Sequence, residues 1–380
     1  MKRLAFFAML GLILICYGCA GLPRPAGRTT AVTRIGTANL IEDTVWEGVV
    51  EISGVVTIPS GVTLTIKPAT RVRFEPTQER LYGSGNGLVI QGTLRAIGSE
   101  TEKIIFTSAS EQPRKGDWND IFFLVSEDQD NILDHCVIEY ANIGVHGHFT
   151  KVTIKNCQLT NNWRAFQIKE TVALITDNLI RDNQYGIRFR DSEIELRGNE
   201  LLNMYSGIET FRSKVKIFNN TVRNCYITSV KCRETETEFS ANVIENCRQG
   251  LQVTDSKEVK IISNRFIANF EHGVALKNSR VVFRKNEVLA NGGDGISVNS
   301  TFLQAGYNNI TGNGKYAIDN KSELGIDARN NWWGGSNLAR IRASFYDYAV
   351  EESLGRVDYR PILNKPVEID DTIPQEVLLK

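Results

Sequence analysis

Aromatic and basic residues recur at nearly regular intervals over residues 163–233, and their chemistry suits the binding of acidic sugars. Aromatic rings stack on the faces of sugars, and guanidinium groups pair with uronate or sulfate oxygens through two parallel hydrogen bonds. If these side chains share one face, we expect a groove for an anionic glycan; the alternative is a set of scattered surface aromatics. The candidate ligand-binding residues are Trp163, Tyr185, Arg188, Arg190, Tyr205 and Arg233.

Carboxylates give a weaker case for catalysis. Hydrolysis of a glycosidic bond needs two carboxyl groups a short distance apart. Asp182 and Glu209 are the weak catalytic candidates near the expected groove, but they belong to different repeats and predict no tight cluster. Asp294, within an Asn-Gly-Gly-Asp-Gly segment, is most simply a turn residue that tolerates an unusual φ. The sequence therefore favours a protein without catalytic activity, and a polysaccharide-active enzyme is the alternative.

The sequence predicts no metal centre, no cofactor and no nucleic-acid partner. His146 and His148 could face the same way on one strand, but no third ligand is evident. Calcium stays open as an alternative, although no cluster of acidic residues points to it. The 44 basic and 44 acidic residues balance, whereas nucleic-acid binding needs a clearly basic surface.

The first residues have the features of a bacterial secretory signal. Two basic residues precede an apolar run from Leu4 to Ile15, and small residues follow. The segment ICYGC resembles a lipobox with Cys19 as the lipidated residue, and Ala20 resembles an outer-membrane sorting signal. The alternative is an ordinary cleaved signal that contains a cysteine. We therefore expect attachment to a membrane through a lipid, in the bacterial cell envelope and at the outer membrane.

An asparagine recurs down the middle of the chain at steps of 21 or 22 residues. A period of this size is typical of a solenoid, because one copy is too short to bury its own apolar face. Apolar residues alternate within each copy, as at Val215 and Ile217, which is the period of a strand. Three strands per copy, stacked in register, predict an all-β parallel β-helix. The asparagines are Asn178, Asn199, Asn220, Asn242, Asn264, Asn286 and Asn308.

Stacking brings equivalent positions of successive coils to about 4.8 Å from one another. Asparagine suits such a row because its amide both donates and accepts hydrogen bonds. Glycines such as Gly186 and Gly207 precede the last strand of each coil, where they suit a positive φ or a close backbone approach. Two inward rows are predicted: Ile154, Ile175, Leu196, Ile217, Phe239, Ile261 and Phe283, and also Phe166, Ile187, Ile208, Val230, Leu251, Val274 and Ile296.

Cysteines occupy equivalent positions in adjacent coils. Cys136 and Cys157 replace asparagine at the start of the row, and Cys225 and Cys247 form a similar pair. Their Cα atoms are expected about 5 Å apart, which permits a disulfide, although parallel Cβ directions make its geometry awkward. We expect stacked, buried free thiols and leave disulfides as the alternative.

Segments at both ends of the repeats resemble a known family. SGVVTIPSGVTLTIKPATRVRF (53–74), GLVIQGTLRAIGS (87–99) and IIFTSASEQPRKGDWNDIFF (104–123) resemble the opening coils of bacterial right-handed β-helix repeat lipoproteins of the pectate-lyase-like superfamily. NNWWGG (330–335), YDY (346–348) and LGRVDYRPIL (354–363) resemble their closing segment. The resemblance implies a single-stranded right-handed parallel β-helix with coils of 21–22 residues. It fixes no activity, because the family includes binding, structural and polysaccharide-processing members.

The expected domains are a lipoprotein signal peptide (1–18), a tether (19–40), the β-helix with capping ends (41–364) and a C-terminal tail (365–380). Trp332 and Trp333 are expected to close the last coil. The whole predicts a lipid-anchored envelope protein that acts as a structural or binding scaffold, with an anionic polysaccharide or an envelope protein as partner. The alternative is a lyase, an epimerase or a hydrolase on the same fold.

Overall fold

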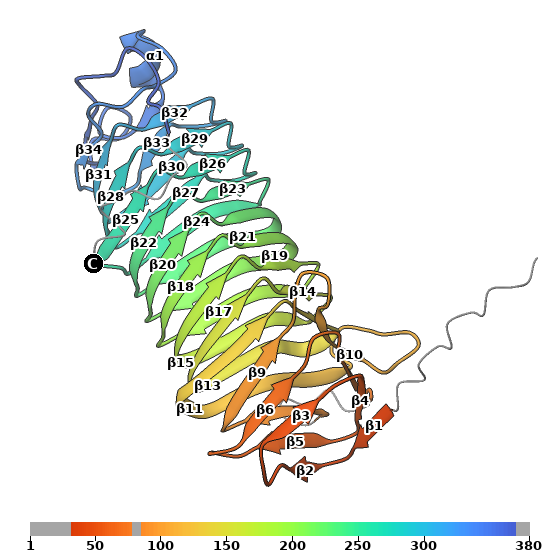
Figure 1. Ribbon diagram of the computed structural model, residues 1–380. Helices are drawn as coiled ribbons and strands as arrows, with labels where there is room; N and C mark the ends of the chain where they lie inside the picture. The colour runs from red at the N-terminus through yellow and green to blue at the C-terminus, as the bar shows by residue number, and fades with distance from the viewer. Residues whose placement is uncertain (1–31, 78–84, 370–380) are drawn as a thin grey trace, which may run out of the picture. The chain divides into compact units, whose positions relative to one another are not determined.

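The computed structural model describes residues 32–77 and 85–369 of the 380-residue chain, and these residues form a stack of β coils (Figure 1). A coil contains three strands, and each strand pairs in parallel with its equivalent in the next coil. We call the three resulting sheets A, B and C, in the order in which the chain enters them. The predicted all-β parallel β-helix is confirmed.

Most strands are short, and five long ones bend through a corner and belong to two sheets. Sheet A contains β1 (Val32–Ile35), β4 (Val49–Ile52), β7 (Arg71–Phe74), β10 (Ile104–Ser108), β12 (Cys136–Glu139), β14 (Gln158–Thr160), β16 (Leu179–Arg181), β23 (Val243–Glu245), β26 (Arg265–Ile267), β29 (Glu287–Leu289) and β32 (Asn309–Thr311). Sheet B contains β2 (Ala38–Asn39), β5 (Val55–Ile58), β8 (Gly87–Ile90), β17 (Tyr185–Arg190), β24 (Gln249–Thr254), β27 (Val274–Lys277), β30 (Ile296–Asn299), β33 (Ile318–Asn320) and β35 (Phe345–Tyr346).

Sheet C contains β3 (Thr44–Trp46), β6 (Thr63–Ile66), β9 (Thr93–Ile97), β18 (Glu193–Arg197), β20 (Lys214–Phe218), β22 (Glu236–Ser240), β25 (Glu258–Ile262), β28 (Arg280–Arg284), β31 (Phe302–Gly306), β34 (Ile326–Asp327) and β36 (Val357–Asp358). Sheets B and C share β11 (Trp118–Asp134), β13 (Ala141–Lys155) and β15 (Arg164–Thr176). Sheets A and B share β19 (Glu200–Phe211) and β21 (Thr221–Arg233).

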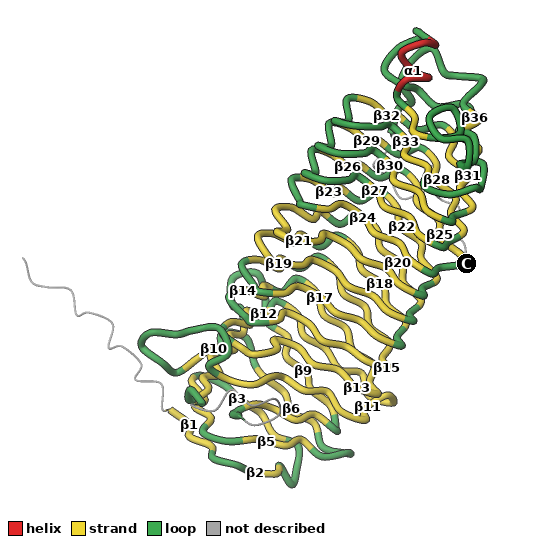
Figure 2. The backbone as a smooth tube through the Cα atoms, turned by 180° about the vertical axis from the view of Figure 1, so that it is seen from behind, coloured by secondary structure: helices red, strands yellow, loops and turns green. Residues whose placement is uncertain are grey.

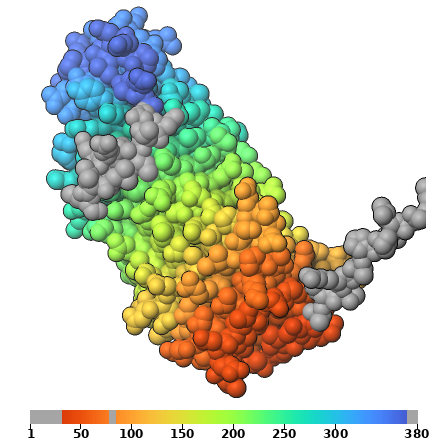
Figure 3. All heavy atoms as spheres, viewed as in Figure 1, coloured from red at the N-terminus to blue at the C-terminus, as the bar shows by residue number. Residues whose placement is uncertain are grey.

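The core lies between the three sheets. In β4, β5 and β6 every second residue is buried, because successive side chains of a strand point to opposite faces. Both predicted inward rows are found in register: Ile154 pairs with Ile175 in sheet C, and Phe166 pairs with Ile187 in sheet B. The surface follows the same order, since sequence colours succeed one another along the stack (Figure 3).

The asparagine row occupies the corner between sheets C and A. The side-chain nitrogen of Asn178 donates to Oδ1 of Asn199 at 2.9 Å and to the carbonyl of Ile154 at 3.0 Å. The same pattern repeats in each later coil and ends at Asn331, which accepts from Asn308 at 2.9 Å. Buried amides bonded in this way fix the register of the coils.

The other two corners contain polar rows of their own, seen as short turns between strands in Figure 2. Asn162 donates to Asn183 at 3.0 Å between sheets A and B. A row of serine and threonine hydroxyls lines the corner between sheets B and C, where the backbone nitrogen of Ser192 donates to Oγ of Ser213 at 3.1 Å. The residue before each row position has a positive φ, as Asp191 does at 51°. The Ser/Thr row was not predicted from the sequence.

The glycine that precedes the last strand of several coils serves only one of its two predicted purposes. Gly186 and Gly207 do not have a positive φ. A Cβ on Gly207 would lie 2.4 Å from the carbonyl oxygen of Ser229, so the glycine permits a close backbone approach. Positive φ angles instead belong to non-glycine residues at the corners, many of them Asn or Asp, which tolerate this region.

All five cysteines of the described residues are free and buried, in agreement with the expected stacked thiols. The backbone nitrogen of Cys136 donates to Sγ of Cys157 at 3.4 Å, and that Sγ lies 3.5 Å from the carbonyl oxygen of Leu133. Cys136 and Cys157 therefore take the place of asparagine amides in the corner row. Burial raises the pKa of Cys136 well above its ordinary value.

The ends of the β-helix differ from the predicted boundaries. β1 begins at Val32 and pairs with β4, so residues 32–39 of the expected tether contribute strands to the first coil. The signal peptide and Cys19 lie outside the described residues, as do residues 370–380 of the tail. At the other end, Trp333 is buried against Phe345 at 4.9 Å between ring centroids, beside the short helix α1 (Leu338–Ala343). Among the described residues no helix has the length and apolarity needed to span a bilayer.

Candidate functional site

The outward face of sheet B carries the residues that the sequence suggested for ligand binding. In β17, Arg188 and Arg190 are exposed, because the residues between and before them point into the core. Tyr185 begins the same strand at the corner with sheet A. A strand rises about 3.3 Å per residue, so β17 spreads one ring and two guanidinium groups across roughly 16 Å of surface.

Four aromatic side chains form a continuous row along the corner between sheets A and B, which we call the aromatic row. Ring centroids lie 6.1 Å apart for Trp163 and Tyr185, 6.2 Å for Tyr185 and Tyr205, and 5.2 Å for Tyr205 and Tyr226. Trp163 is 46% exposed and Tyr226 is 67% exposed. Because large rings are normally buried, exposed rings in a row provide a surface for stacking a ligand.

Guanidinium groups surround one ring at the opposite edge of sheet B. The register places Phe211 between Arg190 and Arg233. The guanidinium carbons of Arg233, Arg212 and Arg190 lie 4.2, 4.7 and 5.8 Å from the Phe211 centroid. Asp191 accepts hydrogen bonds from Arg212 at 2.7 and 2.8 Å and from Arg190 at 3.0 Å. These bonds, those of Arg212 above all, hold the pKa of Asp191 below its ordinary value.

A row of uncommitted charges lies between these two edges. Arg188 is followed in register by Glu209 and then by Lys231. The side chains of these three residues form no hydrogen bond or ion pair with another described residue. Both cations are exposed. The centre of sheet B therefore offers two free cations to an anionic ligand.

The weak catalytic pair does not come together. Asp182 lies in the corner between sheets A and B, has a φ of 55° and accepts a hydrogen bond from Asn203 at 3.1 Å. Glu209 lies on the outward face of β19, opposite Arg188. The two carboxylates share no hydrogen-bond partner, so their arrangement gives no support to joint catalysis.

A different group of titratable residues meets near the C-terminal end of sheet B. Nδ1 of His272 lies 3.2 Å from Oδ2 of Asp294, and Asp319 is near enough for the negative charge of Asp294 to act on it. Nζ of Lys321 lies 3.0 Å from Oδ2 of Asp319. The Asp294 side chain is 3% exposed and that of Asp319 is 9% exposed. Asp294 lies between strands, as predicted for a turn residue, but the predicted unusual φ was wrong, since its φ is not positive. Its side chain is a buried member of an ionic cluster.

The two carboxyl groups of this cluster have unequal acidities. Burial, and then the negative charge of Asp294, raise the pKa of Asp319. Burial also acts to raise the pKa of Asp294, but hydrogen bonds, first of all from His272, outweigh it and lower that pKa. Carboxyl groups whose environments separate their pKa values are suited to act as an acid and a base.

The remaining histidines and carboxylates do not form a metal centre in residues 32–77 and 85–369. His146 pairs with Asp120 at 2.9 Å, and His148 pairs with Glu170 at 2.7 Å, so the two histidines have different partners. No group of three or more His, Cys, Asp or Glu side chains in the described chain could hold a metal ion.

The repeated coils match a family model described as the right-handed beta helix region, over residues 116–217 and 191–332. These ranges together cover more than half of the chain. The chain belongs to the right-handed β-helix family. The right-handed fold expected from the opening and closing segments is therefore confirmed for this family member.

Solved structures of a periplasmic alginate epimerase, AlgG, are similar to this β-helix family member. The enzyme is 15% identical, with 75% of this chain and 77% of that chain covered and a TM-score of 0.53. A mutant of the same enzyme is 17% identical, with 75% and 76% covered and a TM-score of 0.53. At this identity the likeness concerns the fold. The comparison with curated proteins finds no match.

Proposed function

We propose that the protein binds an anionic polysaccharide along the outward face of sheet B, and that a lipid on Cys19 holds it in the bacterial cell envelope. The observation that carries the proposal is the aromatic row with free cations beside it. Rings can stack on successive sugars, while Arg188 and Lys231 can pair with their acidic groups.

The spacing of the coils suits a polymer. Parallel coils repeat about every 4.8 Å, and the four rings come from consecutive coils, so a ligand chain can run along the stack and meet equivalent side chains repeatedly. Many weak contacts then act together on one polymer, which increases overall affinity without any single strong site. The similarity to a periplasmic alginate epimerase supports a polysaccharide as partner and a location outside the cytoplasm.

Attachment at the outer membrane rests on the N-terminal segment alone. Stable anchoring needs more than one acyl chain, as a lipidated N-terminal cysteine supplies. Mass spectrometry of the protein purified from membranes should find a modified Cys19 at the N-terminus. A mature N-terminus without acyl chains would overturn the anchoring part of the proposal and leave the glycan part standing.

A glycan array that holds acidic and neutral polymers tests the binding function. We expect retention of polymers with carboxylate or sulfate groups, and weaker retention as salt rises because exposed charges are screened. Equal retention of neutral polymers of the same backbone would contradict the proposed role of the cations. Absence of retention on every acidic polymer would overturn the binding function itself.

A second function, that of a polysaccharide-active enzyme, is favoured by the cluster of His272, Asp294 and Asp319. Glycosidases use two carboxyl groups about 5–10 Å apart, whereas here the buried carboxylate of Asp294 lies 3.2 Å from Nδ1 of His272. The cluster therefore suits proton transfer, with Asp294 orienting His272, as in a lyase or an epimerase.

Turnover assays separate the two functions. An enzyme should produce new ultraviolet absorbance from unsaturated ends, or altered sugar signals in NMR spectra, and Asp294→Asn should abolish either change while leaving glycan retention intact. Asp255→Asn, an exposed corner residue of another coil, is the matched control. Unchanged polymer after long incubation with the wild-type protein would contradict the enzyme function and leave polysaccharide binding as the proposed function.

A further inference from the structure

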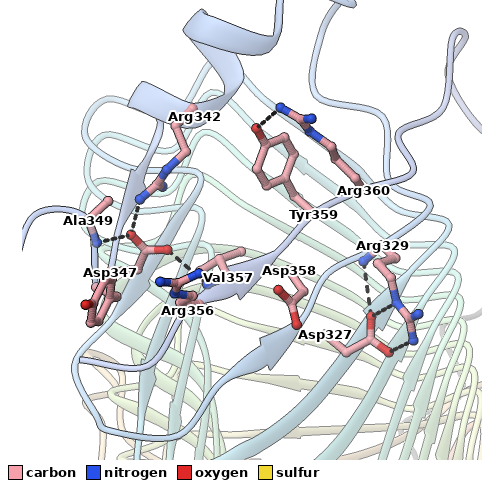
Figure 4. Close-up of a pocket in the computed structure, with 11 residues that line it drawn as sticks. Asp327, Arg329, Arg342, Asp347, Ala349, Arg356, Val357, Asp358, Tyr359 and Arg360 are labelled. Carbon is pink, nitrogen blue, oxygen red and sulfur yellow. Dashed lines mark hydrogen bonds and ion pairs between the residues drawn. The ribbon is translucent and has the colours of Figure 1, made fainter. Parts of the chain in front are cut away.

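The C-terminal cap contains a pocket of about 760 Å³ at the end of sheet C (Figure 4). Its walls come from β34, β36, the end of α1 and the segments that follow α1 and β34. The volume falls within the range that binding sites for small molecules occupy. This pocket belongs to a different sheet from the aromatic row, so it is a separate site.

Two of the arginines that line the pocket are held by carboxylates. Asp347, the central residue of the YDY segment, is buried and accepts from Arg342, from the backbone nitrogen of Val357 at 2.9 Å and from that of Ala349 at 3.1 Å. In the same region Arg329 donates to both oxygens of Asp327 at 2.8 and 2.9 Å. These pairs shape the walls of the pocket, although Nη1 of Arg342 is buried without a hydrogen-bond partner among the described residues.

Two further arginines have no carboxylate partner among the described residues, and tyrosine rings hold them instead. The guanidinium of Arg356 lies 4.6 Å from the centroid of Tyr348. That of Arg360 lies 5.3 Å from the centroid of Tyr359 and donates to its hydroxyl at 3.1 Å. Stacking on a ring restricts a guanidinium without consuming its hydrogen-bond donors, and the bond to the Tyr359 hydroxyl uses one of the five donors of Arg360. Both guanidinium groups can therefore still bind a carboxylate through two bonds.

Asp358 adds an acceptor to the same pocket. Its side chain forms no hydrogen bond with a described residue and is exposed, and it lies opposite Asp327 in the β34–β36 pairing. A bare inorganic anion would gain from the arginines and be repelled by Asp358. A sugar acid can satisfy both, because its carboxylate pairs with the guanidinium groups while a hydroxyl donates to Asp358.

We propose that this pocket binds an acidic sugar, a uronate or a sugar with an equivalent carboxylate, through Arg356, Arg360 and Asp358. The tyrosine rings border the ligand and orient the two guanidinium groups. The inference does not depend on polysaccharide binding at sheet B, and each site is removed by its own substitutions.

Isothermal titration of the full chain with galacturonate, galactose and sulfate tests the proposal. We expect galacturonate to bind, and the double variant Arg356→Ala/Arg360→Ala to weaken its affinity at least about tenfold, since hydrogen bonds to charged groups contribute roughly 1.5–3 kcal/mol each. Arg340→Ala, an exposed arginine of α1 that does not line the pocket, should bind as the wild type does.

Two further variants keep the test decisive if the double alanine variant misfolds. Arg356→Lys/Arg360→Lys retains the charge and loses the two-bond geometry, so it should also weaken galacturonate binding. Asp358→Asn should bring the affinities for sulfate and galacturonate closer together. Galacturonate binding that is unchanged in the lysine variant, or matched by sulfate in the wild type, would overturn the proposal.

Discussion

The rings of Tyr205 and Tyr226 lie 5.2 Å apart between centroids although they belong to different coils. The contact follows from the parallel stacking of β19 and β21, which places one coil directly on the next. A residue type that recurs once per coil thus becomes a continuous surface. The aromatic row is such a surface, and its value for a ligand depends on several rings acting together.

Removal of two adjacent rings should weaken binding of an acidic polymer. For Tyr205→Ala/Tyr226→Ala we expect an affinity about thirtyfold lower, because each of the two aromatic contacts contributes about 1 kcal/mol. Folding should be unaffected, since both side chains are exposed. Phe302→Ala, an exposed ring of sheet C, is the matched control. Equal losses in both variants, measured by titration with a polyuronate, would show that the aromatic row has no special role.

The asparagine row should contribute strongly to stability. In Asn242→Ala, the backbone nitrogen of Asn220 and the carbonyl of Ile217 lose their partners in a buried corner. We expect a loss of about 3 kcal/mol in the free energy of unfolding, because each orphaned buried group costs roughly 1–3 kcal/mol. Urea unfolding provides the measurement.

Two other variants serve as comparisons for the stability loss of Asn242→Ala. Asn242→Cys should lose less than Asn242→Ala, because a thiol fills the equivalent position at Cys157. Asn299→Ala, near the end of β30, should change stability by no more than about 0.5 kcal/mol. A loss in Asn242→Ala as small as that in Asn299→Ala would refute a stabilising role for the row.

The thiols of the described chain should react only after unfolding. Cys136, Cys157 and Cys232 are buried, and burial raises the pKa of Cys136 and of Cys232. A buried thiol with a raised pKa is a poor nucleophile. Alkylation followed by peptide mass spectrometry should label all five in urea without reductant and none in the native protein. Peptides cross-linked between Cys136 and Cys157 would contradict the free thiols.

The pH dependence of stability should reveal the raised pKa of Asp319. The folded protein holds this proton more tightly than the unfolded chain, where an aspartate titrates near 3.8. The stabilising contribution is therefore full below that value and is lost as pH rises through the raised pKa of the folded state. Asp319→Asn does not ionise, so it should melt above the wild type on the alkaline side and close to it on the acid side.

Thermal melting at a series of pH values decides this prediction. Asp294→Asn removes the neighbouring negative charge, so in this variant the loss of stability caused by Asp319 should begin at a lower pH than in the wild type. A wild-type protein that is more stable than Asp319→Asn at neutral pH would mean that the ion pair with Lys321 outweighs burial.

The fold could be predicted because its determinants repeat. Asn178 and its equivalents recur at steps of 21 or 22 residues, and an inward residue such as Ile175 has the same kind of neighbour in adjacent coils. The repeat therefore predicts how the coils stack. The corner of serines and threonines escaped notice because Thr171 and Ser192 are common residue types in any loop. The position of Phe211 between two arginines could not be predicted either, because it depends on the pairing of individual residues in sheet B.

The ionic cluster could not be predicted because its contacts are diagonal. His272 and Asp294 occupy equivalent corner positions in adjacent coils. Asp319 belongs to a different row of sheet B, in which it pairs with Ser297. The distance between Asp294 and Asp319 therefore depends on how side chains cross from one row to another. The pocket at Arg356 and Arg360 similarly depends on an irregular cap, where no repeat specifies the positions of side chains.

The most direct test compares two triple variants in a titration with a soluble polyuronate. Arg188→Ala/Arg190→Ala/Arg233→Ala removes three cations from sheet B, and Arg197→Ala/Arg280→Ala/Arg284→Ala removes three exposed cations from sheet C. The net charge of the two variants is equal, so non-specific attraction falls equally. We predict that the sheet B variant binds at least about tenfold more weakly than the sheet C variant. Equal affinities of the two would contradict polysaccharide binding on sheet B.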